Sequence, residues 1–308
     1  MFSKKLLIPL LSLSLLVTPA YSSHAAENAE AAGTSVEGQG MLSPSSSSES
    51  SESVFNGSGA GTSSEPVTDE KLETILKQVQ SQLPAENGTW AVFISDLVNG
   101  TEGSLNDQKM QAASLIKLYI MGAVYENYDQ ITGQYGRDSV DSNLYSMITV
   151  SDNDAANTLT TYLGGGDSAA GMQAGNSFCQ AHGYDQTHMG RMLLASNEND
   201  DNYTSVGDCG HLLQEIYKQD TSGYTHAADM FNLLKAQTRC NKIPAQLPEG
   251  VKTANKTGEL DNVENDAGII YDSKNDVVIV FMSQNLSSAG SAQNTIATLS
   301  RTIYDYYN

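Results

Sequence analysis

Strand patterns occur near both ends of this 308-residue chain, whereas the long stretch between them is patterned as helices. Thr89 to Leu97 reads as a strand, and Asn99-Gly100 after it is a typical hairpin turn. Three more strands are predicted near residues 251–259, 264–272 and 276–284. Because strands must pair with one another, the two ends of this region have to meet in one sheet.

Apolar residues recur at helical spacing before the first strand, after the last strand and throughout the middle of the chain. The first helix is expected to be capped by Thr68 and the last to cover about 292–306. Further helices are predicted over 114–125, 141–149, 153–163, 166–182, 205–218 and 226–238. The pattern predicts an α+β fold, in which an antiparallel sheet packs against the terminal helices and carries an all-helical insertion.

The first 25 residues have the features of a secretory signal peptide. Lys4 and Lys5 precede an apolar run, Leu6–Val17, and small residues then allow cleavage before Ala26. The run is too short to span a bilayer, and no later segment contains the about 18 consecutive apolar residues that a membrane span needs. We therefore expect a secreted, extracytoplasmic protein without a stable membrane span.

Residues 26–67 are rich in Ser, Gly and Glu and poor in apolar residues, which predicts a disordered spacer ahead of a globular domain at 68–308. The whole chain has a net charge of −20, and residues 68–308 carry 30 acidic and 14 basic residues, a balance of −16. Such a surface repels phosphate backbones, so nucleic acid is excluded as a partner.

The three cysteines, Cys179, Cys209 and Cys240, do not show the spacing of a metal site, and neither do the histidines. We therefore expect neither a metal nor a cofactor. In an exported protein a disulfide is possible, and Cys209 with Cys240 is the expected pair because the two lie on consecutive predicted helices.

Three short motifs with catalytic residue types occur in order along the chain. They are Ser114-Leu115-Ile116-Lys117, Ser151-Asp152-Asn153 and Lys256-Thr257-Gly258. In a chain of this composition about one S-x-x-K, about 0.2 of an S-D-N and about 0.1 of a K-T-G are expected at random. Each motif alone is therefore weak, whereas all three together point to one active site.

The first motif has the geometry of a nucleophile and its base. Ser114 opens an apolar helix, where backbone N–H groups and the positive helix end favour developing negative charge. Lys117 lies one turn further on the same face, so its amine can reach the serine hydroxyl. To act as a base at neutral pH the lysine pKa must fall by about three units, or roughly 4 kcal/mol, through burial and a second cation such as Lys256.

The other two motifs supply candidate substrate contacts. Ser151 can relay a proton to a leaving nitrogen, and the amide of Asn153 can hold a substrate carbonyl. Lys256 and Thr257 can bind a substrate carboxylate, and Gly258 lets the substrate approach the backbone. Taken singly, the second motif reads equally well as a helix cap and the third as the end of a strand.

Together the motifs resemble the signature of class A β-lactamases and penicillin-binding proteins. The resemblance covers about residues 88–308 and extends to Met147-Ile148-Thr149-Val150 and to the stretches 242–248 and 255–260. It implies that Ser114 is the acylated nucleophile, Lys117 its base and Ser151 a proton shuttle. It also implies Asn153, Lys256 and Thr257 as substrate contacts, with an oxyanion hole formed by the backbone N–H groups of Ser114 and Glu259.

One residue departs from the class A pattern. These enzymes carry a glutamate that activates the water for deacylation. When the chain is aligned through Thr187 and Arg191, that position falls near Leu193. Nearby carboxylates that could replace the glutamate are Glu198, Asp200 and Asp201. Loss of a general base typically lowers a rate by 10²–10⁴, so the resemblance implies slow deacylation.

Three functions remain open from the sequence. The first is a β-lactamase-like serine hydrolase that acts on β-lactams or related amides. The second is a D,D-peptidase or esterase that acts on cell-wall peptides. The third is a non-catalytic envelope domain for binding or sensing, which the intact Ser114, Lys117, Ser151 and Lys256 argue against.

Overall fold

The structure is a computed structural model that describes residues 69–308. Its sheet contains five strands in the order β2-β1-β7-β6-β5, and all neighbours are antiparallel. The strands are β1 (Thr89–Asp96), β2 (Thr101–Leu105), β5 (Lys252–Leu260), β6 (Val263–Tyr271) and β7 (Val277–Gln284). A separate short pair joins β3 (Met110–Gln111) to β4 (Tyr203–Thr204). The ends of the described region therefore meet in one sheet, as the strand pattern predicts.

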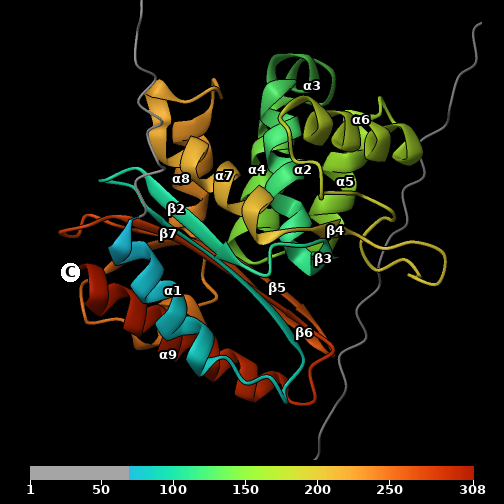
Figure 1. Ribbon diagram of the computed structural model, residues 1–308. Coiled ribbons are helices and arrows are strands. Elements are labelled where there is room, and N and C mark those ends of the chain that lie inside the picture. Colours follow the sequence, from blue (N-terminus) through green and yellow to red (C-terminus); the bar gives the residue numbers. More distant parts are fainter. Residues whose placement is uncertain (1–68) are drawn as a thin grey trace, which may run out of the picture. The chain divides into compact units, whose positions relative to one another are not determined.

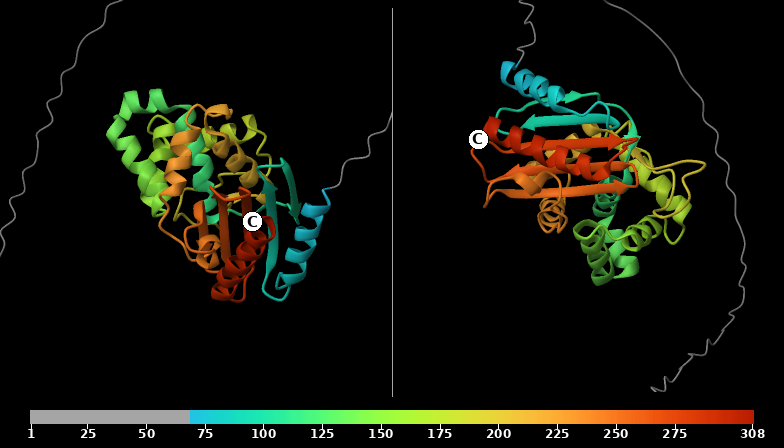
Figure 2. Two further views of the ribbon diagram at one scale, coloured as in Figure 1. Left: turned by 90° about the vertical axis from the view of Figure 1, so that its left-hand side faces the viewer. Right: turned by 90° about the horizontal axis from the view of Figure 1, so that it is seen from below.

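Helices cover both faces of the sheet (Figure 1). The terminal helices α1 and α9 lie together on one face, and the helices between β3 and β5 gather on the other (Figures 1 and 2). The helices are α1 (Glu70–Gln82), α2 (Ile116–Glu126), α3 (Tyr128–Tyr135), α4 (Arg137–Thr149), α5 (Asn153–Leu163), α6 (Ser168–Ala181), α7 (Val206–Lys218), α8 (Ala227–Lys235) and α9 (Ala289–Tyr307). Short 3-10 turns lie at Ala113–Leu115, Gln219–Thr221 and Ile243–Gln246. The predicted α+β fold is thus confirmed.

Burial on both faces explains the composition of the central strands. In β1, Trp90 and Val92 face the terminal helices, while Ala91 and Phe93 face the helical insertion. Alternate residues point to opposite faces of a strand, so a sheet covered on both sides has apolar residues at every position. The run Val277–Met282 in β7 follows the same rule.

Two local features differ from the expectations. Asp69, rather than Thr68, caps α1, because its carboxylate accepts hydrogen bonds from the backbone N–H groups of Lys71 and Leu72. Helix α3 was not predicted, since only Tyr128 and Ile131 of its side chains are buried and a helical period is weak in so short a segment. The expected signal peptide at 1–25, the expected spacer at 26–67 and the predicted start of the domain at residue 68 lie outside the described residues.

The expected disulfide between Cys209 and Cys240 is wrong, because all three cysteines are free. Cys209 lies on the buried face of α7, where its thiol accepts a hydrogen bond from the Tyr119 hydroxyl. Cys240 is exposed on the connection that follows α8. Within residues 69–308, no helix combines the length and the apolar composition that crossing a membrane requires.

Close packing of α5 against α6 depends on a glycine, which gives a stability prediction. A Cβ atom on Gly171 would lie 1.7 Å from the backbone oxygen of Thr160, which cannot move without disturbing α5. We expect Gly171→Ala to lower the free energy of unfolding by about 1–3 kcal/mol. Exposed Gly133 in α3 has no atom within 4 Å of its added Cβ, so Gly133→Ala should instead raise that free energy by about 0.5–1 kcal/mol.

Urea denaturation of the full chain measures both changes. An unfolding free energy of Gly171→Ala equal to that of the parent would show that α5 and α6 separate easily, which contradicts the packing described.

Candidate active site

Ser114 lies in the 3-10 turn that leads directly into α2, at the base of the helical insertion. Strand β5 packs closely on this turn at Gly258. A Cβ atom on Gly258 would lie 2.8 Å from the Ala112 backbone oxygen and 3.2 Å from the backbone nitrogen of Ser114. Glycine is therefore required for the approach of β5, which brings the following residue, Glu259, to the cleft beside the serine.

The amine of Lys117 connects the first two sequence motifs. Its Nζ lies 3.1 Å from Ser114 Oγ and 3.1 Å from Ser151 Oγ. It also donates to two carbonyl-type oxygens, the Ser151 backbone oxygen and Asn153 Oδ1, each at 2.7 Å. Because these two oxygens can only accept, a neutral amine uses both of its N–H bonds on them and has its lone pair left for a serine hydroxyl.

The electrostatics of the site shift Lys117 toward this neutral form. Burial, followed by the charge of Arg239, lowers the pKa of Lys117 to about 8, although Asp152 acts in the opposite direction. Lys256 is also fully buried, and its pKa is held well below the usual value by burial and by the charges of Lys117 and Arg239. The shift expected of Lys117 is therefore present in direction, but the cation that contributes to it is Arg239 rather than the expected Lys256.

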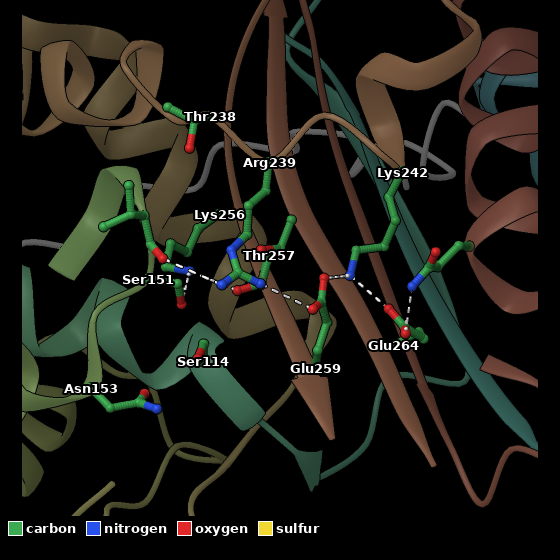
Figure 3. Close-up of polar contacts among 12 residues, drawn as sticks. Ser114, Ser151, Asn153, Thr238, Arg239, Lys242, Lys256, Thr257, Glu259 and Glu264 are labelled. Carbon is green, nitrogen blue, oxygen red and sulfur yellow. Dashed lines mark hydrogen bonds and ion pairs between the residues drawn. The ribbon is translucent and has the colours of Figure 1, made fainter. Parts of the chain in front are cut away.

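Ser151 lies between the two lysines. Lys256 Nζ is 2.9 Å from Ser151 Oγ and donates to the backbone oxygen of Thr257 at 2.8 Å (Figure 3). The Ser151 hydroxyl is thus within hydrogen-bond reach of both amines, which is the position that a proton relay needs. The structure therefore brings Ser114, Lys117, Ser151 and Lys256 into one hydrogen-bonded group.

Three residues around this group have left-handed backbone angles. They are Ala113 (φ 47°), Ser151 (φ 61°) and Leu194 (φ 67°), and none of them is a glycine. Each such conformation costs about 1–3 kcal/mol, and residues of this kind concentrate at functional sites. The backbone is held in these conformations by the packing around it, so the positions of Ser114 and Ser151 are set before any substrate binds.

Asn153 begins α5 and lines the same cleft as Ser114. Since its Oδ1 accepts from Lys117, its amide nitrogen is the polar atom left to donate to a ligand in the cleft. One turn later on α5, Asn157 holds the backbone of Leu193: its Nδ2 donates to the Leu193 oxygen at 3.0 Å, and its Oδ1 accepts from the Leu193 N–H at 2.8 Å. The sequence analysis missed Asn157, although its i+4 spacing from Asn153 places both on one face.

Leu193 therefore lines the cleft where the alignment puts the glutamate of class A enzymes. Its side chain is largely buried and offers no group that could activate water. Of the nearby carboxylates, Asp200 pairs with His188 at 2.7 Å and Asp201 with Arg191 at 2.7 Å. Glu198 is exposed and does not belong to the residues that line the cleft.

The cleft has a volume of about 330 Å³. Its lining includes Ser114 and Asn153, Glu259 and Leu260 of β5, and the segment 193–197. Among the side chains of residues 69–308, no cluster of three or more His, Cys, Asp or Glu is arranged to hold a metal ion.

A row of alternating charges, which the sequence analysis missed, borders the cleft at β5 (Figure 3). Arg239 Nη1 lies 3.1 Å from Glu259, Lys242 Nζ lies 2.9 Å from Glu259, and Lys242 lies 2.7 Å from Glu264 of β6. Lys242 is fully buried. Arg239 lies 20 positions before Glu259 in an irregular segment, so periodicity and motif spacing carry no signal for the contact.

An antiparallel sheet with an inserted helical lobe and a serine beside two buried lysines define the β-lactamase-like class of hydrolases. The chain belongs to the beta-lactamase enzyme family, which matches residues 71–138 and 134–307. The family resemblance seen in the sequence is thereby confirmed. No curated protein sequence matches the chain.

Solved structures with the same fold include penicillin-binding and β-lactamase proteins. PBP-A has 22% identity and a TM-score of 0.66, over 76% of this chain and 96% of PBP-A. A PBP-A mutant solved as an acyl-enzyme complex with penicillin G has 23% identity and a TM-score of 0.65, over 76% of this chain and 96% of that one. The β-lactamase of Sphaerobacter thermophilus has 21% identity and a TM-score of 0.63, over 75% of this chain and 95% of that one. At these identities the similarity concerns the fold.

The lowered pKa of Lys117 predicts how the reactivity of Ser114 depends on pH. Only the neutral amine can accept the serine proton, and its fraction rises about tenfold per pH unit below the pKa. Labelling of Ser114 by a fluorescent penicillin should therefore accelerate as pH rises and level off above about 8. Lys117→Ala should slow labelling at neutral pH by about 10²–10⁴.

The pH dependence is measured from initial labelling rates, with circular dichroism as the control for folding at each pH. A rate that does not change between pH 6 and pH 8, over which the neutral fraction of a lysine with a pKa of about 8 rises about fiftyfold, would exclude Lys117 as the base.

Proposed function

We propose that this protein is a secreted serine hydrolase that forms an acyl-enzyme on Ser114 with β-lactams or related amides and releases the acyl group slowly. The observation that carries the proposal is the position of Lys117 Nζ, 3.1 Å from both Ser114 Oγ and Ser151 Oγ, beside a cleft lined by Leu193. The signal-peptide pattern of residues 1–25 supports secretion.

In the proposed acylation, neutral Lys117 accepts the Ser114 proton while Ser114 Oγ attacks the substrate carbonyl carbon. The backbone N–H groups of Ser114 and Glu259 stabilise the oxyanion, assisted by the positive end of α2. When the C–N bond breaks, Ser151 donates its proton to the leaving nitrogen. Ser151 then receives the proton that Lys117 took from Ser114. Asn153 orients the acyl portion of the substrate through its amide nitrogen.

Deacylation lacks an equivalent base. A water molecule that attacks the acyl-enzyme would meet the hydrocarbon side chain of Leu193, whose main chain is fixed by Asn157. Loss of a general base costs about 10²–10⁴ in rate, so the acyl-enzyme is expected to accumulate.

A second candidate is a D,D-peptidase or esterase that acts on cell-wall peptides. It is favoured by the position of β5 at the edge of the sheet, directly beside Ser114, where an extended peptide can add as a further strand. A binding or sensing domain of the cell envelope is the third candidate, and it would retain the fold without turnover.

The first prediction from this proposal concerns the lifetime of the acyl-enzyme. Penicillin G, which forms an acyl-enzyme with the PBP-A mutant, should add its full mass to the protein and remain bound, while a chromogenic cephalosporin should show a burst with little further turnover. Ser114→Ala should acquire no mass. Leu193→Glu should accelerate deacylation by roughly 10²-fold or more, because it places a carboxylate beside the water.

Leu193→Gln is the matched control, since it has the same length as glutamate but cannot accept the proton. Rapid turnover by the parent protein would contradict slow deacylation and direct attention to Glu198. Absence of both adduct and turnover would contradict acylation by β-lactams and favour the binding domain.

A further inference from the structure

The side chain of Glu259 places a carboxylate at the end of the cleft where the sequence predicts that a substrate carboxylate would bind. Glu259 and Thr257 are two residues apart on β5, so their side chains lie on the same face of the strand, about 7 Å apart along it. A substrate carboxylate on the Thr257 side would therefore lie close to the Glu259 carboxylate.

Glu259 is held as an anion by its neighbours. Partial burial opposes its ionisation, but the hydrogen bond and charge of Lys242, together with the charge of Arg239, lower its pKa below the usual value. Lys242 is itself fixed by Glu264, which also accepts a hydrogen bond from Gln293 at 2.8 Å. The position of Glu259 is thus determined by a buried ion-pair network.

The cations near the cleft are already engaged. Arg239, which is about half exposed, is the cation closest to solvent, and its guanidinium contacts Glu259 and the Val150 backbone oxygen. Arg191, in the cleft lining, pairs with the largely buried Asp201. Arg191, Arg239 and Lys242 each have a carboxylate partner, whereas Lys256 donates to the Ser151 hydroxyl and the Thr257 backbone oxygen.

We propose that Glu259 is a specificity-determining residue. It forms an ion pair with Arg239 and thereby favours acyl donors in which the group that binds next to β5 is uncharged. Such donors are esters and amides in which that end carries no free carboxylate. This inference rests on the proposed function, because it names the class of substrate that Ser114 would accept. The net charge of −16 over residues 68–308 acts in the same direction on an approaching anion.

The test compares penicillin G with its methyl ester, which differ in charge at the relevant end. We expect the full-chain protein to be acylated by the ester at least as fast as by the acid, measured by mass spectrometry under second-order conditions. In Glu259→Gln the backbone N–H is retained and Arg239 loses its ionic partner, so the ratio of acid to ester rates should rise roughly tenfold or more.

Asp261→Asn is the matched control. Asp261 is exposed just after β5 and makes no ion pair, so this change removes one negative charge near the cleft and leaves Arg239 paired. Its ratio of acid to ester rates should stay within about twofold of the parent. A rise equal to that of Glu259→Gln would show a general charge effect and overturn the role given to the Glu259–Arg239 pair.

Binding to Ser114→Ala, measured by calorimetry, separates this inference from the proposed function. Tighter binding of the ester than of the acid, with no adduct on the parent protein, would overturn acylation and support the charge selectivity. Stronger binding or faster acylation of the acid by tenfold, unchanged in Glu259→Gln, would overturn the selectivity while leaving the acyl-enzyme in place. Failure of both compounds to bind or react would overturn both the selectivity and the proposed function.

Discussion

The buried amine of Lys117 is the contact on which the rest of the site depends. It lies within hydrogen-bond distance of four oxygen atoms. One belongs to Ser114, and the other three belong to Ser151 and Asn153 of the second motif, so the amine joins the start of α2 to the start of α5. Burial penalises a charged ammonium at this depth, and this lowers the pKa of the amine to about 8. The buried contacts that lower the pKa of the lysine therefore also hold Ser151 and Asn153 beside the nucleophile Ser114.

The sheet supplies the second half of this arrangement. Lys256 comes from β5, nearly 140 residues after Lys117 in the chain, and reaches Ser151 because Gly258 allows β5 to pack on the Ser114 turn. The two buried lysines repel each other electrostatically, which lowers the pKa of Lys256 further. Strand pairing across the whole domain is thus what brings the second amine to the first.

The sequence predicted the parts of this structure that depend on local patterns. The range 153–163 matches α5 because its apolar face is regular and its cap residue, Asp152, is a strong one. The three motifs meet in space as expected: the first two lie at the starts of α2 and α5, and the third lies within β5. Helix α3 and the cap at Asp69 were missed or misplaced because their signals are weak or one residue wide. The Arg239–Glu259 contact and the unpaired state of Cys209 depend on tertiary packing, which periodicity does not encode.

The exposure of Cys240 has a practical consequence. The other two thiols, Cys179 and Cys209, are buried, and burial raises the pKa of each of them to about 12. A maleimide dye would therefore attach selectively beside Arg239, at the border of the cleft. The native sequence thus provides a single exposed thiol at which a fluorophore can be attached.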